Sequence, residues 1–270
     1  MLPYRDENPT RRTPIVTIVL LLVNIAVFVL LQFHGSNDPI IDLPDPVASV
    51  ELEQTEATFL YSRAAIPCEI LQVRPLSIAE ISRTLGGGFE HSCGKARTEG
   101  ETLQKALFPE KAIWLSVLMS MFLHGDLLHL AGNMLFLWIF GNNIEDRWGR
   151  ISFALFYVFG GVAATLGHAL AAPDSTVPLV GASGAIAAVM GAYLVLFPRV
   201  RIRAILGIFP LRVPAWVLLG VWFVTQFFVA PESDVAWMAH VVGFVVGIAI
   251  ALLLRTRNRP AEPATALRLR

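Results

Sequence analysis

Two polar side chains inside apolar stretches have the types that nucleophilic catalysis requires. Ser183 lies in the apolar stretch 179–197, and His240 lies in the apolar stretch 235–254. A serine hydroxyl is a poor nucleophile unless a base accepts its proton, and a neutral histidine is the usual base. We therefore expect Ser183 to act as a nucleophile and His240 as its general base.

A second pair of polar side chains has the types that stabilise an oxyanion. His129 and Asn133 are four residues apart, so they share one face of a helix. Acyl transfer builds negative charge on an oxygen atom, and N–H donors directed at that oxygen stabilise it. We expect His129, Asn133 and the backbone N–H of Ser183 to serve as these donors.

The elements that carry these residues are apolar enough to lie in a membrane. The chain is 55% hydrophobic and 16% charged, which is too apolar for an ordinary soluble protein of 270 residues. A helix of about 17 to 25 apolar residues spans a bilayer. We predict an all-α integral membrane protein with six spans, at residues 15–33, 127–140, 151–171, 179–197, 213–229 and 235–254. The apolar residues 112–123, before the short second span, are expected to dip into the outer leaflet.

Basic residues set the expected orientation, because Lys and Arg in short flanking segments resist translocation. They lie before the first span, between spans two and three, between spans four and five, and after the last span: Arg5, Arg11, Arg12, Arg147, Arg150, Arg199, Arg201, Arg203, Arg212, Arg255, Arg257 and Arg259. The short loops 172–178 and 230–234 contain neither Lys nor Arg. We therefore predict a membrane domain at 15–254 with cytoplasmic termini (1–14 and 255–270) and an extracytoplasmic loop at 34–110.

This topology places the candidate residues at a common depth. Spans two, four and six run from outside to inside, and each polar residue lies roughly three to seven residues past the outer end, about 5 to 10 Å below the surface at about 1.5 Å per residue. Asp126 lies nearer the surface, and Glu145 and Asp146 lie at the cytoplasmic end. Because no carboxylate shares the depth of His240, we expect a Ser-His dyad.

Small residues indicate how the two helices of the dyad could approach. Ala187 and Gly191 follow Ser183 at intervals of four residues, and Gly243 and Gly247 follow His240 on roughly the same helix face. Stripes of small side chains let helix backbones come close in a membrane. If spans four and six pack through these stripes, Ser183 and His240 meet within hydrogen-bonding distance.

The predicted outer loop, residues 34–110, is acidic and contains both cysteines of the chain. It has twelve acidic residues and six basic ones, together with Cys68 and Cys93. A disulfide on the oxidising side of the membrane and two free thiols are both compatible with this placement. The glycine run at 86–88 and the scattered prolines indicate turns, and we assign the loop no fold.

Four motifs resemble those of the rhomboid family of intramembrane serine proteases. In chain order they are HxxxxHxxxN at 124–133, GxxxExxxG at 141–149, GxSG at 181–184 and AHxxGxxxG at 239–247. The resemblance covers residues 15–254 apart from most of the outer loop. It departs from the family at Leu115 and Ser116, where members often have Trp-Arg, and at Ala187, where some members have an aromatic residue that stacks on the catalytic imidazole.

The resemblance implies a role for each matching residue. Ser183 is then the nucleophile and His240 the base, while His129, Asn133 and Gly181 stabilise the oxyanion or bind substrate. Structural roles are implied for the remaining motif residues: His124, Glu145, Arg147, Gly243 and Gly247.

The implied activity is hydrolysis of a peptide bond in or near the transmembrane segment of a single-span membrane protein, through a covalent acyl-enzyme. The implied partners are transmembrane-helix substrates and the lipid bilayer, with no cofactor, no metal and no nucleic acid. Chain length and low charge favour a bacterial inner (plasma) membrane, with both termini inside.

Three other interpretations fit the sequence less well. A catalytically silent relative that retains membrane proteins would lack the serine or the histidine, and this chain has both. A transporter predicts charged residues in the middle of spans, and none occurs in the six predicted spans. A metal site of His124, His129 and His168 is disfavoured, because five-residue spacing puts the first two on different helix faces and zinc motifs use a spacing of four with a glutamate between.

Overall fold

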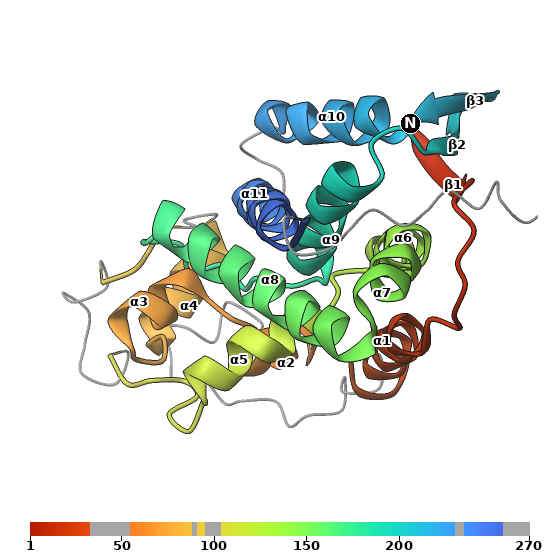
Figure 1. Cartoon of the computed structure of the whole chain (residues 1–270). Helices are drawn as coiled ribbons and strands as arrows, with labels where there is room; N and C mark the ends of the chain where they lie inside the picture. Colours follow the sequence, from red (N-terminus) through yellow and green to blue (C-terminus); the bar gives the residue numbers. More distant parts are fainter. Residues whose placement is uncertain (33–54, 88–90, 95–103, 230–234, 256–270) are drawn as a thin grey trace, which may run out of the picture.

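The computed structural model describes residues 1–32, 55–87, 91–94, 104–229 and 235–255, which form a mostly helical bundle with one small sheet (Figure 1). The predicted loop 230–234, the glycine at 88 and nearly all of the predicted C-terminal tail lie outside the described residues.

Four helical stretches are long and apolar enough to cross a membrane. The first is α1 (Ile15–Ala26) with η1 (Val27–Gln32), and the second is α6 (Leu127–Phe136), η5 (Leu137–Gly141) and α7 (Asn142–Trp148). The third is α8 (Arg150–Ala171), and the fourth is most of α11 (Trp237–Arg255). These stretches agree with an integral membrane protein and with predicted spans one, two, three and six.

Three further apolar helices are shorter than a span. They are α5 (Ile113–Met119) with η4 (Ser120–Phe122), α9 (Ser183–Leu196), and α10 (Ala215–Thr225) with η6 (Gln226–Phe228). Predicted spans four and five were therefore too long. Leu179 pairs with Ala65 as an isolated β-bridge, and Val213 belongs to a strand, so neither residue is helical. A helix of 14 residues is about 21 Å long, less than the roughly 30 Å of a bilayer core.

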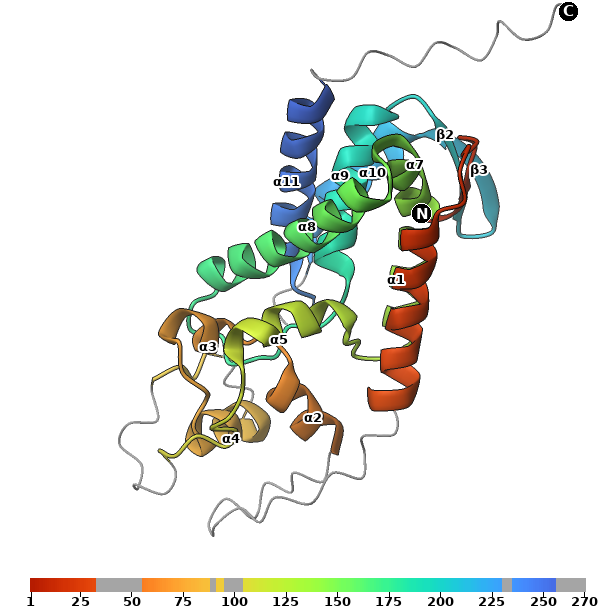
Figure 2. The ribbon, with the colours of Figure 1, turned by 60° about the horizontal axis from the view of Figure 1, so that its bottom comes forward.

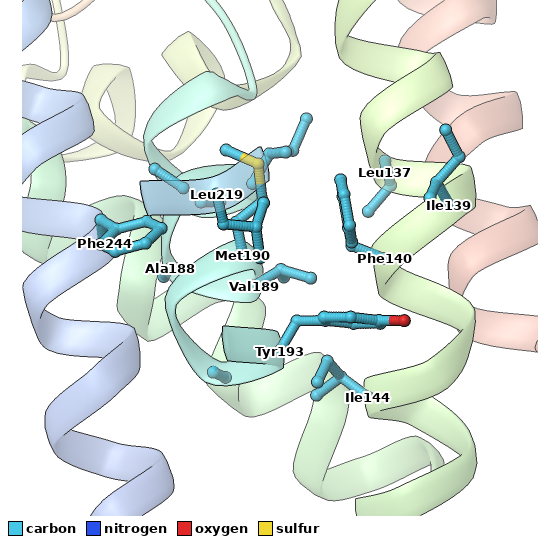
Figure 3. Close-up of a cluster of buried hydrophobic side chains, with 14 of the residues drawn as sticks. Leu137, Ile139, Phe140, Ile144, Ala188, Val189, Met190, Tyr193, Leu219 and Phe244 are labelled. Carbon is cyan, nitrogen blue, oxygen red and sulfur yellow. The ribbon is translucent and has the colours of Figure 1, made fainter. Parts of the chain in front are cut away.

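Helix α9 is the centre of the bundle, packed against α8, α10 and α11 (Figures 1 and 2). Every residue from Gly184 to Tyr193 is buried. In Figure 3 the side chains of Val189 and Tyr193 face the η5–α7 helix, while Ala188 lies beside Phe244 of α11. A helix enclosed on all sides is apolar all round, which explains its lack of a polar face.

Glycines allow α9 and α11 to pack backbone against backbone. A Cβ atom at Gly243 would overlap the carbonyl oxygen of Gly184, and one at Gly247 would overlap that of Ala188. In the opposite direction, a Cβ at Gly191 would overlap the carbonyl oxygen of Phe244. The close approach that the small-residue stripes predicted is therefore present in the structure.

A three-stranded antiparallel sheet was not expected from the sequence, so the all-α prediction needs this correction. β1 (Leu2–Asp6) pairs with β2 (Arg201–Leu206), which forms a hairpin with β3 (Phe209–Pro214). Asp6 anchors the N-terminal strand, since its Oδ2 accepts hydrogen bonds from Tyr193 Oη (3.0 Å) and Asn143 Nδ2 (2.8 Å). Pairing of β1 with β2 joins segments about 200 residues apart in the sequence. Local sequence patterns cannot predict such a pairing.

Part of the predicted outer loop folds into a helical cap at the end of the bundle opposite the sheet (Figure 2). Its helices are α2 (Thr55–Arg63), α3 (Pro67–Gln72) and α4 (Ile78–Gly87). Cys68 and Cys93 form a disulfide inside the cap, beside a small apolar cluster of Tyr61, Ile66, Leu76 and Ile81.

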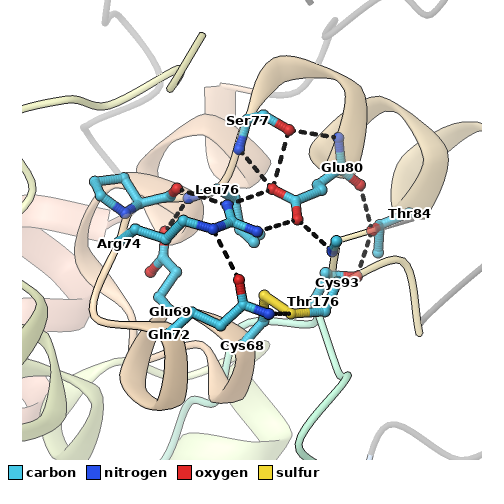
Figure 4. Close-up of polar contacts among 12 residues, drawn as sticks. Cys68, Glu69, Gln72, Arg74, Leu76, Ser77, Glu80, Thr84, Cys93 and Thr176 are labelled. Carbon is cyan, nitrogen blue, oxygen red and sulfur yellow. Dashed lines mark hydrogen bonds and ion pairs between the residues drawn. A yellow bond between two sulfur atoms is a disulfide. The ribbon is translucent and has the colours of Figure 1, made fainter. Parts of the chain in front are cut away.

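Buried carboxylates stabilise the cap through hydrogen bonds (Figure 4). Glu80 accepts from Arg74 Nη1 (2.8 Å) and from the backbone N–H groups of Ser77 (2.8 Å) and Gly94 (2.7 Å). Glu69 forms an ion pair with Lys111 in which both side chains are buried. The cap has little apolar core of its own, so the disulfide and these hydrogen-bonded carboxylates hold its segments together.

The cap also holds the segment between α8 and α9 in place. The backbone N–H of Cys68 donates to Ser175 O (3.0 Å), and that of Leu179 donates to Ala65 O (2.7 Å). The hydroxyls of Thr84 and Thr176 are 2.6 Å apart. The chain that leads into Ser183 is therefore fixed by contacts with the cap.

Replacement of Gly247 by Ala should destabilise the bundle, because the added methyl group would force apart the backbones of α9 and α11. We expect a loss of about 1 to 3 kcal/mol, measured by thermal unfolding in detergent. Gly220→Ala on α10 is the matched control, since nothing lies within 4 Å of its Cβ position. Equal melting temperatures for the Gly247 and Gly220 variants would contradict the packing described.

The cap should lose stability in acid through Glu80. Burial alone would raise the pKa of Glu80, but hydrogen bonds from Arg74, Gly94 and Ser77 lower it to about 2 from the usual 4.5. A group with a lowered folded-state pKa stabilises fully above its unfolded pKa, so this contribution should fade as the pH falls from 4.5 towards 2.

We expect a loss of about 2 kcal/mol over that range, read from hydrogen exchange of the α4 amides. Glu80→Gln is the control, because it cannot titrate at this position. An identical pH dependence in this variant and in the wild type would show that Glu80 is not responsible.

Candidate active site

Ser183 is the first residue of α9, and a strained turn before it sets its position. Gly181 has φ +120°, a conformation that side chains rarely permit. Its backbone N–H donates to Ser120 O (2.9 Å), and the Ser120 hydroxyl accepts from the N–H of Ala65 (2.6 Å). The turn is thus tied to η4 and, through Ser120, to the cap.

His240 of α11 lies within hydrogen-bonding distance of this serine. Its Nε2 is 2.8 Å from Ser183 Oγ. Gly184 and Gly243, whose close packing was described above, follow the two residues by one and three positions. The geometry is that of a serine whose proton a histidine can accept.

Gln226 approaches the other nitrogen of the same imidazole, a contact that was not predicted from the sequence. Its Oε1 is 2.8 Å from His240 Nδ1, and the residue is only 7% exposed. The sequence feature that could have indicated its role is an uncharged polar residue near the end of the apolar stretch 213–229. The ring of Trp222, one turn earlier, lies 5.8 Å from the His240 ring at 41°, so an aromatic from α10 approaches the imidazole although residue 187 is Ala.

His129 directs its Nε2 towards the turn at Gly181. Its backbone N–H donates to Asp126, the N-cap of α6 (2.8 Å), and this bond lowers the pKa of the Asp126 carboxyl. Its Nδ1 accepts from the N–H of Gly125 (3.4 Å), so in the neutral ring Nε2 carries the proton. A Cβ at Gly181 would lie 2.9 Å from His129 Nε2 and 3.5 Å from Ser183 Oγ, so this position requires glycine.

Asn133 places an amide donor in the lining of the cavity that Ser183 also lines. The residue is 7% exposed, and its Nδ2 makes no hydrogen bond within the part of the chain that the structure describes. A buried donor without a partner is costly, so it usually has a ligand or a catalytic use.

A cavity of about 480 Å³ joins these groups. Its polar lining comes from Asp126, His129, Asn133, Ser183 and His240, and its apolar lining includes Phe136, Ile186, Met190 and Trp222. Asp126 and Leu128 are exposed, so the cavity opens at the N-terminal end of α6. A nucleophile, a base and two N–H donors that share one cavity can carry out acyl transfer.

His124 supports the start of α6. It is fully buried, its backbone N–H donates to Gln32 Oε1 (3.1 Å), and its ring meets that of His129 edge-on at 5.3 Å. Burial lowers the pKa of His124 to about 4, so the ring is neutral at pH 7. These contacts connect Gln32 of η1 to His124 and, through the ring contact, to His129.

Glu145 joins α7 to α1 at the opposite end of the bundle. Its carboxylate accepts from the backbone N–H groups of Val16 (2.9 Å) and Thr17 (2.8 Å) and from the Thr17 hydroxyl (2.8 Å). It therefore caps the N-terminus of α1, where Pro14 supplies no side-chain cap. Arg147 lies in the last turn of α7, and its side chain makes no hydrogen bond or ion pair with the residues that the structure describes.

Comparison with protein families identifies residues 111–257 as a rhomboid domain. The chain is 36% identical over 107 residues to Rhomboid protein 1, mitochondrial, of Saccharomyces cerevisiae. The matched segment covers 38% of this chain and 30% of that protein. It is 40% identical over 73 residues to Rhomboid-like protein 11, chloroplastic, of Arabidopsis thaliana (27% of this chain, 26% of the relative). It is 32% identical over 94 residues to Presenilin-associated rhomboid-like protein A, mitochondrial, of Danio rerio (34% and 24%).

The matches cover about a quarter to a third of the length of these curated relatives. These relatives are named as mitochondrial or chloroplastic proteins, so they do not support the bacterial membrane expected from chain length and low charge. The family match spans more than half of the chain and contains all five residues named above as the polar lining of the cavity. This chain therefore belongs to the rhomboid family.

Proposed function

We propose that this protein is an intramembrane serine endopeptidase that hydrolyses a peptide bond in or near the transmembrane segment of single-span membrane proteins. The observation that carries the proposal is the 2.8 Å contact between Ser183 Oγ and His240 Nε2 inside the 480 Å³ cavity. Membership of the rhomboid family supports it.

The first half of the reaction transfers the acyl group to Ser183. Its Oγ attacks the carbonyl carbon of the scissile peptide bond as His240 Nε2 takes the hydroxyl proton. The carbonyl oxygen becomes an oxyanion, which Asn133 Nδ2–H and His129 Nε2–H can stabilise. The C–N bond then breaks, and His240 returns the proton to the departing amine.

The second half hydrolyses the acyl-enzyme. A water molecule in the cavity gives its proton to His240 Nε2 and attacks the ester carbon. The same donors stabilise the second oxyanion, and collapse releases the carboxylic acid with the proton back on Ser183 Oγ. The opening at the exposed residues Asp126 and Leu128 offers a route for this water.

We further propose six membrane crossings with both termini inside. Helices α9 and α10 are short, but surrounding helices enclose α9, and the non-helical approach at 179–182 is held by the cap at Ala65 and by η4 at Ser120. In this orientation the cap and the cavity mouth face the outside, where the Cys68–Cys93 disulfide persists.

An activated serine should react with a fluorophosphonate probe. We expect Ser183→Ala to abolish labelling of the detergent-purified protein, and His240→Ala to slow it by about a thousandfold, because the hydroxyl loses its base. Ser116→Ala is the matched control, since among the described residues the hydroxyl of this buried serine bonds only to Ile113 O of its own helix (2.6 Å). A folded wild type that does not label would instead favour a role in binding membrane proteins.

Substrate cleavage should depend on how easily the substrate helix unwinds near its outer end. A peptide bond must be extended to reach Ser183, so a span with Gly, Ser or Pro at that level should be cut at least about tenfold faster than an all-Leu/Ala span, since such residues cost up to about 3 kcal/mol in a helix. The comparison uses two single-span proteins in the same proteoliposomes, with cleavage followed on gels. Equal rates would count against this substrate class.

A further inference from the structure

A line of hydrogen bonds connects the last turn of α10 to the proposed nucleophile. Gln226 Nε2 donates to the backbone carbonyl of Trp222 (3.0 Å), and Gln226 Oε1 lies 2.8 Å from His240 Nδ1. His240 Nε2 then meets Ser183 Oγ at 2.8 Å. The line therefore crosses from the end of α10 and the first residue of η6 to α11 and then to α9.

The directions of these bonds follow from the chemistry of the first one. A backbone carbonyl only accepts, so the amide nitrogen of Gln226 must face Trp222 O, and its Oε1 must face the imidazole. An amide oxygen also only accepts, so His240 Nδ1 must be the protonated nitrogen. His240 Nε2 then has a free lone pair directed at Ser183, as a general base requires.

The opposite tautomer would disable the site. A proton on His240 Nε2 would leave no lone pair facing Ser183 Oγ, and the lone pair of Nδ1 would then face the oxygen of Gln226. Two acceptors 2.8 Å apart repel each other, so Gln226 disfavours this tautomer. A third residue commonly orients a catalytic histidine by accepting a hydrogen bond from its Nδ1–H.

We propose that Gln226 is a positioning residue that holds His240 in the tautomer and orientation needed to deprotonate Ser183, an inference that rests on the proposed peptidase function. Within the described part of the chain, no carboxylate contacts His240 Nδ1; Asp126 lines the cavity but caps α6. A neutral amide suits this depth better than a carboxylate, since an amide can be satisfied by two hydrogen bonds without burial of a charge.

The arrangement makes the base dependent on the position of α10. Trp222 and Gln226 are one helical turn apart, and both meet His240, one by its ring at 5.8 Å and the other by a hydrogen bond. Ser183 and His240 instead belong to α9 and α11, which are interlocked at their glycines. A shift of the last turn of α10 would therefore release His240 Nδ1 while leaving the two helices of the dyad in contact.

The test compares Gln226→Leu, which removes the acceptor at similar size, with Gln226→Glu, whose protonated form keeps both the carbonyl oxygen and a donor for Trp222 O. Thr225→Val is the matched control, because the Thr225 hydroxyl bonds to the same carbonyl (2.6 Å) and the side chain is exposed. Cleavage of a transmembrane substrate by the full-length protein gives kcat and KM, and thermal unfolding gives Tm.

We expect Gln226→Leu to lower kcat by about 10- to 100-fold with KM changed by less than about twofold, because the substrate cavity is intact and only the base is misplaced. Gln226→Glu should recover most of this loss, and Thr225→Val should keep the wild-type kcat. A kcat of Gln226→Leu equal to that of Thr225→Val would overturn the inference. So would parallel losses of kcat and Tm in both Gln226 variants, which indicate a packing role alone.

Nitrogen NMR of ring-labelled histidine provides the readout that a packing role would not move. The His240 signals, identified by their loss in His240→Ala, should show a protonated Nδ1 and an unprotonated Nε2 in the wild type, and a mixture of tautomers in Gln226→Leu. A protonated Nε2 in the neutral wild type would overturn the proposal. Failure of the proposed function is distinguishable, because the wild type itself would then neither cleave substrate nor label, and this inference would fall with it.

Discussion

The close packing of α9 against α11 is the contact on which the site depends. Gly243 accommodates the carbonyl of Gly184, and this contact lies within one helical turn of both Ser183 and His240. Any side chain at Gly243 would move α11 outward and lengthen the 2.8 Å contact between the dyad atoms. Stability and chemistry therefore rest on the same backbone contact, which lipid cannot replace because it supplies no complementary shape.

Three other parts of the structure supply groups that support Ser183 and His240 on this helix pair. The cap and Ser120 fix the turn at Gly181, which lets the ring of His129 lie close to the serine. Helix α6 supplies Asn133, whose amide donor is buried without a partner among the described residues. The segment η6, which continues α10, supplies Gln226 to the base. The nucleophile is central, and each support comes from a different segment of the chain.

Features that depend on local side-chain type were predictable from the sequence. Apolar stretches gave the helices at 15–32 and 150–171 nearly to the residue, and the spacing of Gly243 and Gly247 after His240 gave the close helix contact. Features that depend on distant partners were not predictable. Strand β1 needs β2, the start of α9 depends on the bridge between Ala65 and Leu179, and the role of Gln226 appears only when α10 lies beside α11. The disulfide was one of two open alternatives, because the fold that joins Cys68 to Cys93 is not visible in their spacing.

The central claim is that Ser183, its base and its N–H donors form one acyl-transfer site. The most direct test is an experimental structure of the protein after reaction with a fluorophosphonate. We expect a bond between Ser183 Oγ and phosphorus, with the phosphoryl oxygen about 3 Å from Asn133 Nδ2 and directed towards His129. An adduct on another residue, or a phosphoryl oxygen directed away from both donors, would contradict the claim.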